Sequence, residues 1–293
     1  MVLAALGAAV LWPMAPPSQA APVLPPLNVS ATALQLPGAF VWFDLATDDV
    51  TAARAFYGAV FGWTFRGAGD DASGYTVISL GQRDIGGIFR PAGASSRSGR
   101  WLSLMSVPDP VAAARFTEQH GGKVLVAPAT MARRGMHALL ADPEGAVFGV
   151  LRSSSGDPAD GAVADGEFFW ADLFSRAPAT AAEFYRGLAG YEVSPMALEI
   201  NGVQRVLLSA AGFARASIAP LPQPDMQPGW LPYILVSDVA ATVERAKQAG
   251  GSVVLAASPE VLDGQLAVIA DPRGGVIGIV NWRAPEPAQG ASR

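Results

Sequence analysis

The stretch FVWFDLATDDVTAARAFYGAVFGW, residues 40–63, returns in a second version, FFWADLFSRAPATAAEFYRGLAGY, at residues 168–191. Trp42 matches Trp170 and Asp44 matches Asp172, and both pairs are 128 positions apart (170 − 42 = 172 − 44 = 128). A Phe-Tyr dipeptide recurs at the same offset. A fixed internal period indicates that one structural unit is used more than once, so it decides the architecture.

Each version predicts a strand followed by a helix. Val41, Phe43 and Leu45 alternate with Trp42 and Asp44, which is the period-two pattern of a strand. Apolar positions spaced by three and four then follow, as on one face of a helix, with Thr47 or Asp48 as its cap. Short strand candidates come next, separated by turn-forming residues; the first version has them at 63–66, 75–80 and 85–90.

This order of strand, helix and strands occurs four times, at about residues 38–91, 100–152, 166–220 and 229–283. In the second and fourth units Asp109, and Ser237 or Asp238, can cap the helix, and a Gly-Gly pair ends it. Each unit therefore predicts a βαβββ element whose sheet has an open concave face. Two such units side by side would form a cup of about eight strands that can hold a small ligand.

The units group into two domains, residues 38–152 and 166–283, joined by a linker at 153–165. Residues 284–293 are expected to be a disordered tail. Residues 1–37 read as a signal-like apolar segment and a Pro-rich linker, although no basic residue precedes the apolar run. Ser18-Gln19-Ala20 offers a signal-peptide cleavage site, so we expect export to the periplasm or medium; the alternative is a cytoplasmic protein with a disordered apolar tail.

Composition excludes several classes of function. The chain has no cysteine, which removes thiol catalysis, thiolate metal sites and disulfides. The net charge of −5 argues against nucleic acid as a partner, and no internal apolar run is long enough to span a membrane. The sequence also lacks a Ser/His/Asp arrangement, a P-loop and a dinucleotide-binding motif.

The unit order, the run D-x-x-x-A-x-x-F-Y-x-x-x-F-G-W at 49–63, and the endings ADPEGAVFGV and ADPRGGVIGI resemble the vicinal oxygen chelate superfamily. This superfamily includes glyoxalase I, bleomycin and fosfomycin resistance proteins and extradiol dioxygenases. The resemblance covers residues 38–283 and is nearest to the double-domain, glyoxalase-like branch. It implies an α+β fold of two tandem domains, each a pair of βαβββ units forming a curved, cup-like mixed sheet with helices outside. The superfold hosts many reactions, so the resemblance leaves the activity open.

The resemblance also implies where a metal ion would bind. The ligand positions of the family fall on Trp42, Leu102 and Gly149 in the first domain and on Trp170, Leu231 and Gly278 in the second. None of these side chains can coordinate a divalent ion, and their neighbours offer no replacement. We therefore expect no metal cofactor at the usual family positions.

The repeated Asp44 and Asp172 are candidate catalytic or substrate-anchoring groups, because aspartate is rare in strands and a buried carboxylate needs a partner. The alternative is a strand-end carboxylate that bonds a nearby loop. His137 is a candidate general acid or base, or else structural. Arg100, Arg133 and Arg134 could meet an anionic substrate, although a solvated surface is the simpler interpretation. The candidate ligand-binding residues, which could instead fill the core, are Trp42, Trp170, Trp101 and Trp230.

Three functions fit these observations. The first is binding of a small organic molecule in aromatic-walled cups without the metal of the family, with Asp44 and Asp172 as polar contacts. The second is a glyoxalase-like lyase, or a related enzyme, with an unconventional site that uses Asp44 and His137. In a third, one half is only a structural partner of the other. We expect a monomer, because the repeats can pair within one chain.

Overall fold

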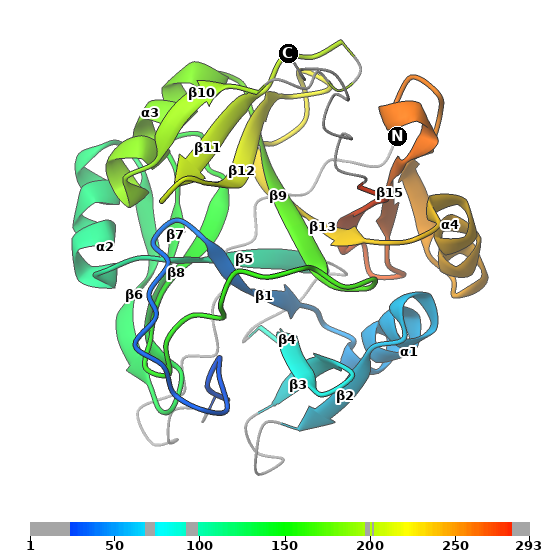
Figure 1. Ribbon diagram of the computed structural model, residues 1–293, viewed down its shortest axis with the longest axis horizontal. Helices are drawn as coiled ribbons and strands as arrows, with labels where there is room; N and C mark the ends of the chain where they lie inside the picture. The colour runs from blue at the N-terminus through cyan, green and yellow to red at the C-terminus, as the bar shows by residue number, and fades with distance from the viewer. Residues whose placement is uncertain (1–23, 68–73, 92–98, 197–199, 201, 283–293) are drawn as a thin grey trace, which may run out of the picture.

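The structure, a computed structural model, describes residues 24–67, 74–91, 99–196, 200 and 202–282 (Figure 1). The apolar segment at 1–12, the cleavage site at 18–20 and the tail at 284–293 lie outside these residues. No helix within the described part of the chain is long and apolar enough to cross a membrane.

The first domain is one eight-stranded mixed sheet with strand order β2-β3-β4-β1-β5-β8-β7-β6. Its helices are α1 (Val50–Phe61) and α2 (Pro110–Gln119). Its strands are β1 (Phe40–Ala46), β2 (Thr64–Gly67), β3 (Tyr75–Leu80), β4 (Arg83–Phe89), β5 (Arg100–Ser106), β6 (Lys123–Met131), β7 (Gly135–Ala141) and β8 (Val147–Ser153).

The second domain repeats this sheet in the order β10-β11-β12-β9-β13-β16-β15-β14. Its helices are α3 (Pro178–Ala189) and α4 (Val239–Gln248). Its strands are β9 (Phe168–Ser175), β10 (Glu192–Pro195), β11 (Val206–Ala210), β12 (Phe213–Pro220), β13 (Gly229–Leu235), β14 (Ser252–Leu255), β15 (Leu266–Ala270) and β16 (Val276–Val280). The predicted α+β fold with two tandem domains is confirmed.

The pairing register of the central strands is the same in both domains. In the first, β1 runs antiparallel to β5 with Asp44 opposite Leu102. In the second, β9 runs antiparallel to β13 with Asp172 opposite Leu231. Because side chains alternate along a strand, equal registers place the repeated Trp and Asp on the same face of each sheet. We call this face the cup face.

Helix starts follow the sequence with one correction. The cap of α1 is Asp49, whose carboxylate accepts a hydrogen bond from the main-chain N–H of Ala52 at 2.9 Å, rather than Thr47 or Asp48. Asp238 caps α4 in the same way. A side-chain oxygen can accept from an unpaired N–H only two or three residues ahead of it, which favours the residue directly before the helix.

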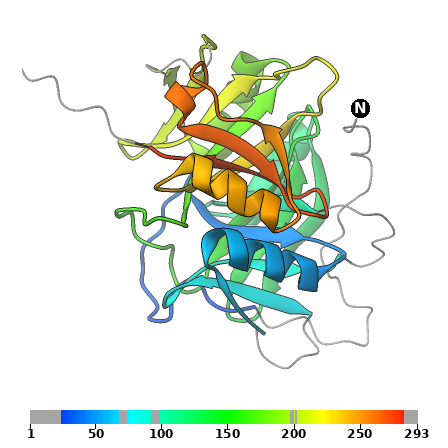
Figure 2. The same cartoon turned by 90° about the vertical axis from the view of Figure 1, so that its right-hand side faces the viewer.

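The helices lie on the opposite face of each sheet and pair across the domains. Helix α1 lies beside α4, and α2 lies beside α3 (Figures 1 and 2). The two hydrophobic cores on this side each contain residues from both domains: Tyr57 and Phe56 pack with Ile234, while Phe148 packs with Tyr185. The domains therefore share their cores, and neither helix-covered face is open to solvent.

Two matching hydrogen-bond chains cross this shared core. The Tyr57 hydroxyl donates to Asp271 of the second domain at 2.9 Å and accepts from the indole N–H of Trp101 at 2.9 Å. In the mirror arrangement, Tyr185 donates to Asp142 of the first domain at 3.1 Å and accepts from Trp230 at 2.9 Å. The repeated Phe-Tyr dipeptide and the repeated Asp-Pro turn thus bind each other across the domain boundary.

Residues 24–37 have neither helix nor strand, yet they are docked on the first domain. Leu24 and Leu27 are buried against its cup face. The Asn28 side-chain amide donates to the carbonyl oxygens of Gly156 and Asp157 at 2.9 and 3.1 Å. The sequence predicted an extended linker here. The lack of helix and strand agrees with that prediction, but the packing against the first domain was not foreseen.

Candidate functional site

The first cup contains a buried polar cluster around Asp44. The Trp42 indole N–H donates to Asp44 Oδ1 at 2.9 Å, and the Tyr75 hydroxyl donates to the same oxygen at 2.6 Å. The Arg134 guanidinium carbon lies 4.0 Å from the centre of the Trp42 ring, within cation–π range. Burial raises the pKa of Asp44, and the positive charge of Arg134 opposes that rise. Asp44 thus has the partners that its repeated position predicted it would need.

A glycine makes room for this cluster. Gly87 on β4 lies opposite Asp44 in the parallel β1–β4 ladder. A Cβ atom at Gly87 would lie 1.9 Å from the Tyr75 hydroxyl oxygen and 2.6 Å from Asp44 Oδ1. Any side chain at this position would push Tyr75 and Asp44 apart, so glycine is required by close approach rather than by backbone conformation.

His137 lies on β7 inside the same cup and is 3% exposed. Burial, and then the positive charge of Arg134, lower the pKa of His137 to about 4. The imidazole is therefore neutral at neutral pH. It therefore has no imidazolium proton to donate and is a weak proton acceptor, which does not favour the role of general acid or base that the sequence left open.

The lowered pKa of His137 makes stability depend on pH. Between its ordinary value of 6.5 and about 4, the unfolded chain binds a proton that the folded chain excludes, so folding loses free energy as pH falls through this window. Lowering the pH from 7.5 to 5.0 is expected to remove about 2 kcal/mol of stability through this residue. The measurement is urea unfolding of the native chain and of His137→Gln at both pH values. The native chain should lose about 2 kcal/mol more than the variant; equal losses contradict the assignment.

The second cup contains a related polar cluster, in which the aspartate forms a direct ion pair with an arginine. The Trp170 indole N–H donates to Asp172 Oδ1 at 3.0 Å. Asp172 also forms a buried ion pair with Arg205 on the loop before β11, and it accepts from the Ser217 hydroxyl. Ser217 lies opposite Asp172 on β12, the register position that Gly87 fills in the first cup. Burial and the negative charge of Asp172 raise the pKa of Tyr233 well above 10.

Arg205 is held by its ion pair with Asp172 but has one hydrogen-bond donor, Nε, that is not used within the described residues. Its side chain is 7% exposed, and one terminal nitrogen of the guanidinium donates to Asp172. Its Nε atom is buried and has no hydrogen-bond partner within the described residues. A buried donor without a partner is energetically unfavourable, so an acceptor oxygen brought by a ligand would be stabilised there.

The two cups differ in how far they are filled. Leu24 and Leu27 cover the first cup, in which Trp42 and Arg134 are almost fully buried. Aromatic side chains of the second cup are only half-buried, namely Phe169, Trp170 and Trp282. The second cup is therefore the more accessible of the two.

The residues at the metal positions of the family do not fit a metal ion. A Cβ atom added at Gly278 would lie 2.1 Å from Tyr233 Cδ1, and one added at Gly149 would lie 2.7 Å from Leu104 Cγ. Neighbouring side chains thus fill the space into which a liganding carboxylate at 149 or 278 would project. Within the described ranges, no three His, Cys, Asp or Glu side chains are grouped closely enough to hold an ion.

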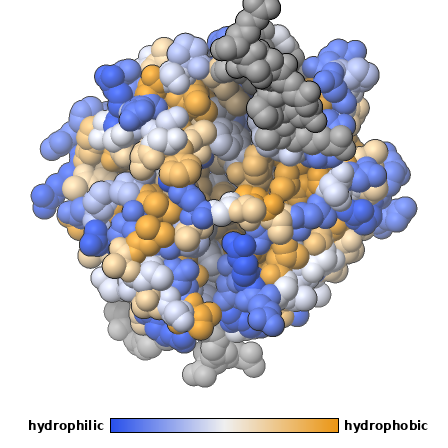
Figure 3. Space-filling view, in the orientation of Figure 1, coloured by the Kyte–Doolittle hydropathy of each residue, from blue (hydrophilic) through white to orange (hydrophobic). Residues whose placement is uncertain are grey.

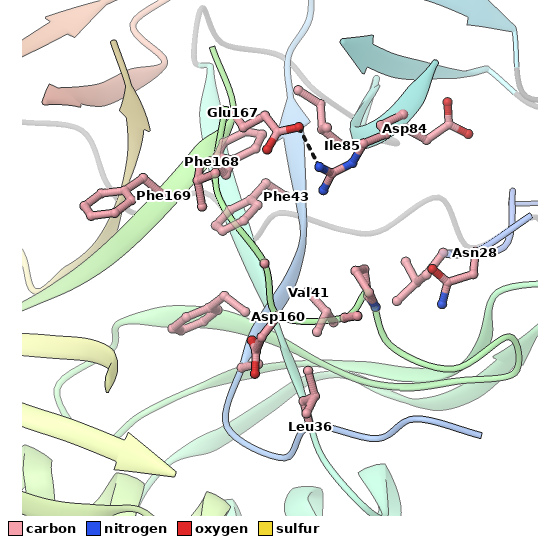
Figure 4. Close-up of a pocket in the computed structure, with 18 of the residues that line it drawn as sticks. Asn28, Leu36, Val41, Phe43, Asp84, Ile85, Asp160, Glu167, Phe168 and Phe169 are labelled. Carbon is pink, nitrogen blue, oxygen red and sulfur yellow. Dashed lines mark ion pairs between the residues drawn. The ribbon is translucent and has the colours of Figure 1, made fainter. Parts of the chain in front are cut away.

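A cleft of about 810 Å³ is lined by residues of both domains and of the segment that joins them. The space-filling view shows a hollow near the middle of the molecule, with hydrophobic and hydrophilic residues around it (Figure 3). Phe43 and Phe168 stack beside this cleft with ring centres 4.0 Å apart, and Glu167 pairs with Arg83 at 3.0 Å (Figure 4). Trp170 lines both this cleft and the second cup, so the cleft leads to the second cup.

The structure separates the four candidate tryptophans into two groups. Trp42 and Trp170 lie on the cup faces and bond the repeated aspartates. Trp101 and Trp230 lie on the opposite, helix-covered faces, where they donate to the tyrosine hydroxyls of the two interdomain chains. Trp101 and Trp230 therefore line neither cup. The reason is strand parity, since Trp101 pairs with Leu45, one position away from Asp44.

Sequence reasoning missed the two arginines. Arg134, which the sequence favoured as a surface residue, is 1% exposed, and Arg205 was not considered. Neither arginine follows the repeat. The second and fourth units are 129 positions apart, and 134 + 129 = 263, where Asp263 stands; the first and third are 128 apart, and 205 − 128 = 77, where Val77 stands. Each belongs to a turn or loop before a strand, so the internal period carries no signal for it.

Each domain of this chain contains a match to a known protein family, and the chain as a whole has relatives of known sequence. Residues 39–81 match the family described as bleomycin resistance protein-like N-terminal, and residues 169–280 match the glyoxalase-like domain. The chain is 31% identical over 276 residues to the anthracycline biosynthesis protein DauV of Streptomyces sp. (strain C5), covering 87% of this chain and 98% of that protein. It is 27% identical to the protein named "Putative glyoxylase CFP32" of Mycobacterium tuberculosis (strain CDC 1551 / Oshkosh), covering 85% of this chain and 95% of that protein.

Solved structures share the fold at low sequence identity. The Mn(II)-bound glyoxalase from Novosphingobium aromaticivorans is 18% identical and superposes with a TM-score of 0.57, covering 85% of this chain and 83% of that one. The 2,2',3-trihydroxybiphenyl 1,2-dioxygenase from Sphingomonas wittichii strain RW1 is 15% identical with a TM-score of 0.54, covering 85% and 91%. The family matches, the 31% identity to DauV over 87% of the chain and the two cup-forming sheets show that the chain belongs to the vicinal oxygen chelate superfamily, as a two-domain member.

Proposed function

We propose that this protein binds a planar aromatic molecule in its second cup, without the metal ion of the family. The observation that carries this proposal is Arg205. Asp172 holds this guanidinium in place, yet its Nε donor has no partner among the described residues, and the guanidinium carbon lies 5.9 Å from the centre of the half-buried Phe174 ring. An aromatic ligand with a carbonyl or phenolic oxygen would satisfy the donor and cover the aromatic walls.

The chemistry of the cup supports a neutral aromatic ligand. Ligand sites are mostly apolar, with a few fixed polar groups that set orientation. Here Asp172 balances the charge of Arg205, so a ligand need not bring a charge of its own. Trp170 offers a rigid stacking surface, and its N–H is already engaged by Asp172, which fixes the ring orientation.

The relatives point to the same ligand class. Two proteins that this chain matches over most of its length, DauV and DnrV of Streptomyces, are named for anthracycline biosynthesis. Anthracyclines are planar polycyclic molecules that carry hydroxyl and ketone oxygens. A ligand of this general kind would meet both requirements of the second cup, a flat apolar body and an acceptor oxygen.

A glyoxalase-like lyase is the alternative, favoured by the glyoxalase-like domain match at residues 169–280. The metal content of the purified protein separates the two functions. A lyase with an unconventional centre would keep about one equivalent of tightly bound Ni, Zn, Fe or Mn that is lost in Asp44→Ala and Asp172→Ala. A binding protein of the proposed kind would bind its aromatic ligand equally well after treatment with a chelator.

The proposed function is tested by titration with 1,2-dihydroxyanthraquinone, followed by quenching of tryptophan fluorescence and by calorimetry. The full chain should bind one equivalent in the second cup. Trp170→Ala should weaken binding about tenfold, because it removes the stacking surface. Trp230→Phe is the matched control, since Trp230 lies in the shared core, and it should leave the affinity unchanged. Equal affinity in Trp170→Ala and the native chain would show that the ligand binds elsewhere.

A further inference from the structure

The first cup is closed by the chain itself. Leu24 and Leu27 are buried on its cup face, and the Pro25 carbonyl oxygen accepts a hydrogen bond from Arg134 Nε at 2.7 Å. We propose that the first cup is a second small-molecule site and that residues 24–27 occupy the space of its ligand. The Pro25 carbonyl then stands where a carbonyl oxygen of the ligand would bind Arg134.

The closed cup retains unused bonding capacity. Asp44 Oδ2 and Arg134 Nη2 are both buried, and neither has a hydrogen-bond partner in the described part of the chain. Asp44 is 0% exposed and Arg134 is 1% exposed. An acceptor and a donor left unpaired in one buried cluster are unfavourable for folding alone, because each loses its bonds to water. A ligand that forms hydrogen bonds with both Asp44 Oδ2 and Arg134 Nη2 would remove this cost.

These two atoms define the ligand class independently of the second cup. Arg134 Nη2 requires an acceptor, and Asp44 Oδ2 pairs best with a hydroxyl donor. The Trp42 ring beneath the guanidinium favours a flat, apolar body. The matching molecule is a planar aromatic compound that bears a hydroxyl group and a carbonyl oxygen.

Residues 24–27 are bound in a way that permits their release. They form no strand, and Pro25 and Pro26 have no N–H to donate. Among the described residues, the bond from Arg134 to Pro25 is the one hydrogen bond that holds them. The chain is anchored again directly afterwards, where Asn28 bonds the carbonyl oxygens of residues 156 and 157. The covering segment can therefore leave while residues from Asn28 onward stay in place.

A route for exchange adjoins the segment. Residues 25–28 also line the cleft of about 810 Å³, so the covering segment lies between that cleft and the first cup. Within the described residues, the second cup lacks a counterpart of this segment: the offset of 128 carries residues 24–27 to 152–155, at and just after the end of β8 in the first domain. One duplicated cup is thus covered by its own chain, while its counterpart is left accessible.

The test compares the full chain with a chain lacking residues 1–27, using 1,2-dihydroxyanthraquinone as the probe and calorimetry to count binding sites. The shortened chain should bind one equivalent more than the full chain. Arg134→Met in the shortened chain should remove that extra equivalent, whereas Arg186→Met, which changes an exposed residue, should not. A folded shortened chain that binds no additional probe overturns the proposal.

The outcome also separates this inference from the proposed function. If the full chain binds no probe and the shortened chain binds one equivalent, the second-cup proposal is wrong and the first-cup site remains. If both chains bind one equivalent, the first-cup site is wrong and the second-cup proposal remains.

A second variant covers the case in which the shortened chain fails to fold. Leu24→Ser/Leu27→Ser in the full chain weakens the cover without removing it. The loss of two buried leucines should shift the closed state on the order of 100-fold, and probe affinity at the first cup should rise to match. Unchanged affinity in this variant, with circular dichroism showing a native fold, overturns the proposal.

Discussion

Arg205→Met is expected to abolish binding of an aromatic ligand to the second cup and to lower the free energy of unfolding by about 3–5 kcal/mol. The loss of binding follows from removal of Arg205 Nε, a buried donor that has no partner among the described residues. The loss of stability has a different cause. Asp172 is 2% exposed, and without Arg205 its charge stays buried without a counter-charge.

A double variant distinguishes these two effects. Asp172→Leu/Arg205→Met replaces a buried ion pair by apolar side chains, a change that is often neutral or stabilising. It should recover most of the lost stability but none of the ligand binding. Urea unfolding and calorimetric titration of the four chains complete the cycle.

The control for this cycle is Arg186→Met, which breaks an exposed ion pair with Glu183 and should cost less than about 0.5 kcal/mol. If Arg205→Met were as mild as Arg186→Met, the buried pair would not be the centre of the second cup.

Asp271→Ala is expected to lower the free energy of unfolding by about 3 kcal/mol, although Asp271 lies in a turn between strands. Its carboxylate accepts from the N–H groups of Arg273 and Gly275 at 2.7 and 2.9 Å, and from the Tyr57 hydroxyl of the other domain at 2.9 Å. Alanine would leave all three donors without a partner. Since two of them shape the turn and one joins the domains, both features should weaken together.

Removing single hydroxyl groups should show how much of the stability lost in Asp271→Ala comes from the bond between the domains. Tyr57→Phe removes only the bond across the boundary and should cost about 1–2 kcal/mol, as should Tyr185→Phe at the mirror position. Asp225, on an exposed loop, provides the control, and Asp225→Ala should be close to neutral. A cost for Asp271→Ala no larger than that for Asp225→Ala would show that the chain of hydrogen bonds does not stabilise the shared core.

Much of the fold could be predicted because its signals are local or repeated. Strand alternation around Asp44, helix caps and Gly stops, and an offset of 128 residues are all readable without contacts. The same logic correctly placed Trp42 and Asp44 on one face of a strand. It kept Trp101 as a ligand-binding candidate together with Trp42, because the face on which a β5 side chain lies depends on the register of β5 against β1.

The site was less predictable because its charged members do not repeat. Arg134 and Arg205 reach the two aspartate clusters from unrelated loops. From sequence alone, an arginine in a loop is predicted to lie on the surface. The cover over the first cup was also beyond sequence reasoning. A Pro-rich stretch predicts an extended conformation, but not the surface on which Leu24 and Leu27 are buried. Export of the chain stays a prediction.

The number of units, their order and the absence of suitable metal ligands at the family positions follow from residue identity and spacing along the chain. The arginine that lies beside each aspartate, the cup that is covered, and the bonds between the domains through Tyr57 and Tyr185 depend on how the chain folds in three dimensions. The physical reason is distance. Hydrogen bonds and burial act over a few ångströms in space, yet they join groups as far apart along the chain as Tyr57 and Asp271, which are separated by 214 positions.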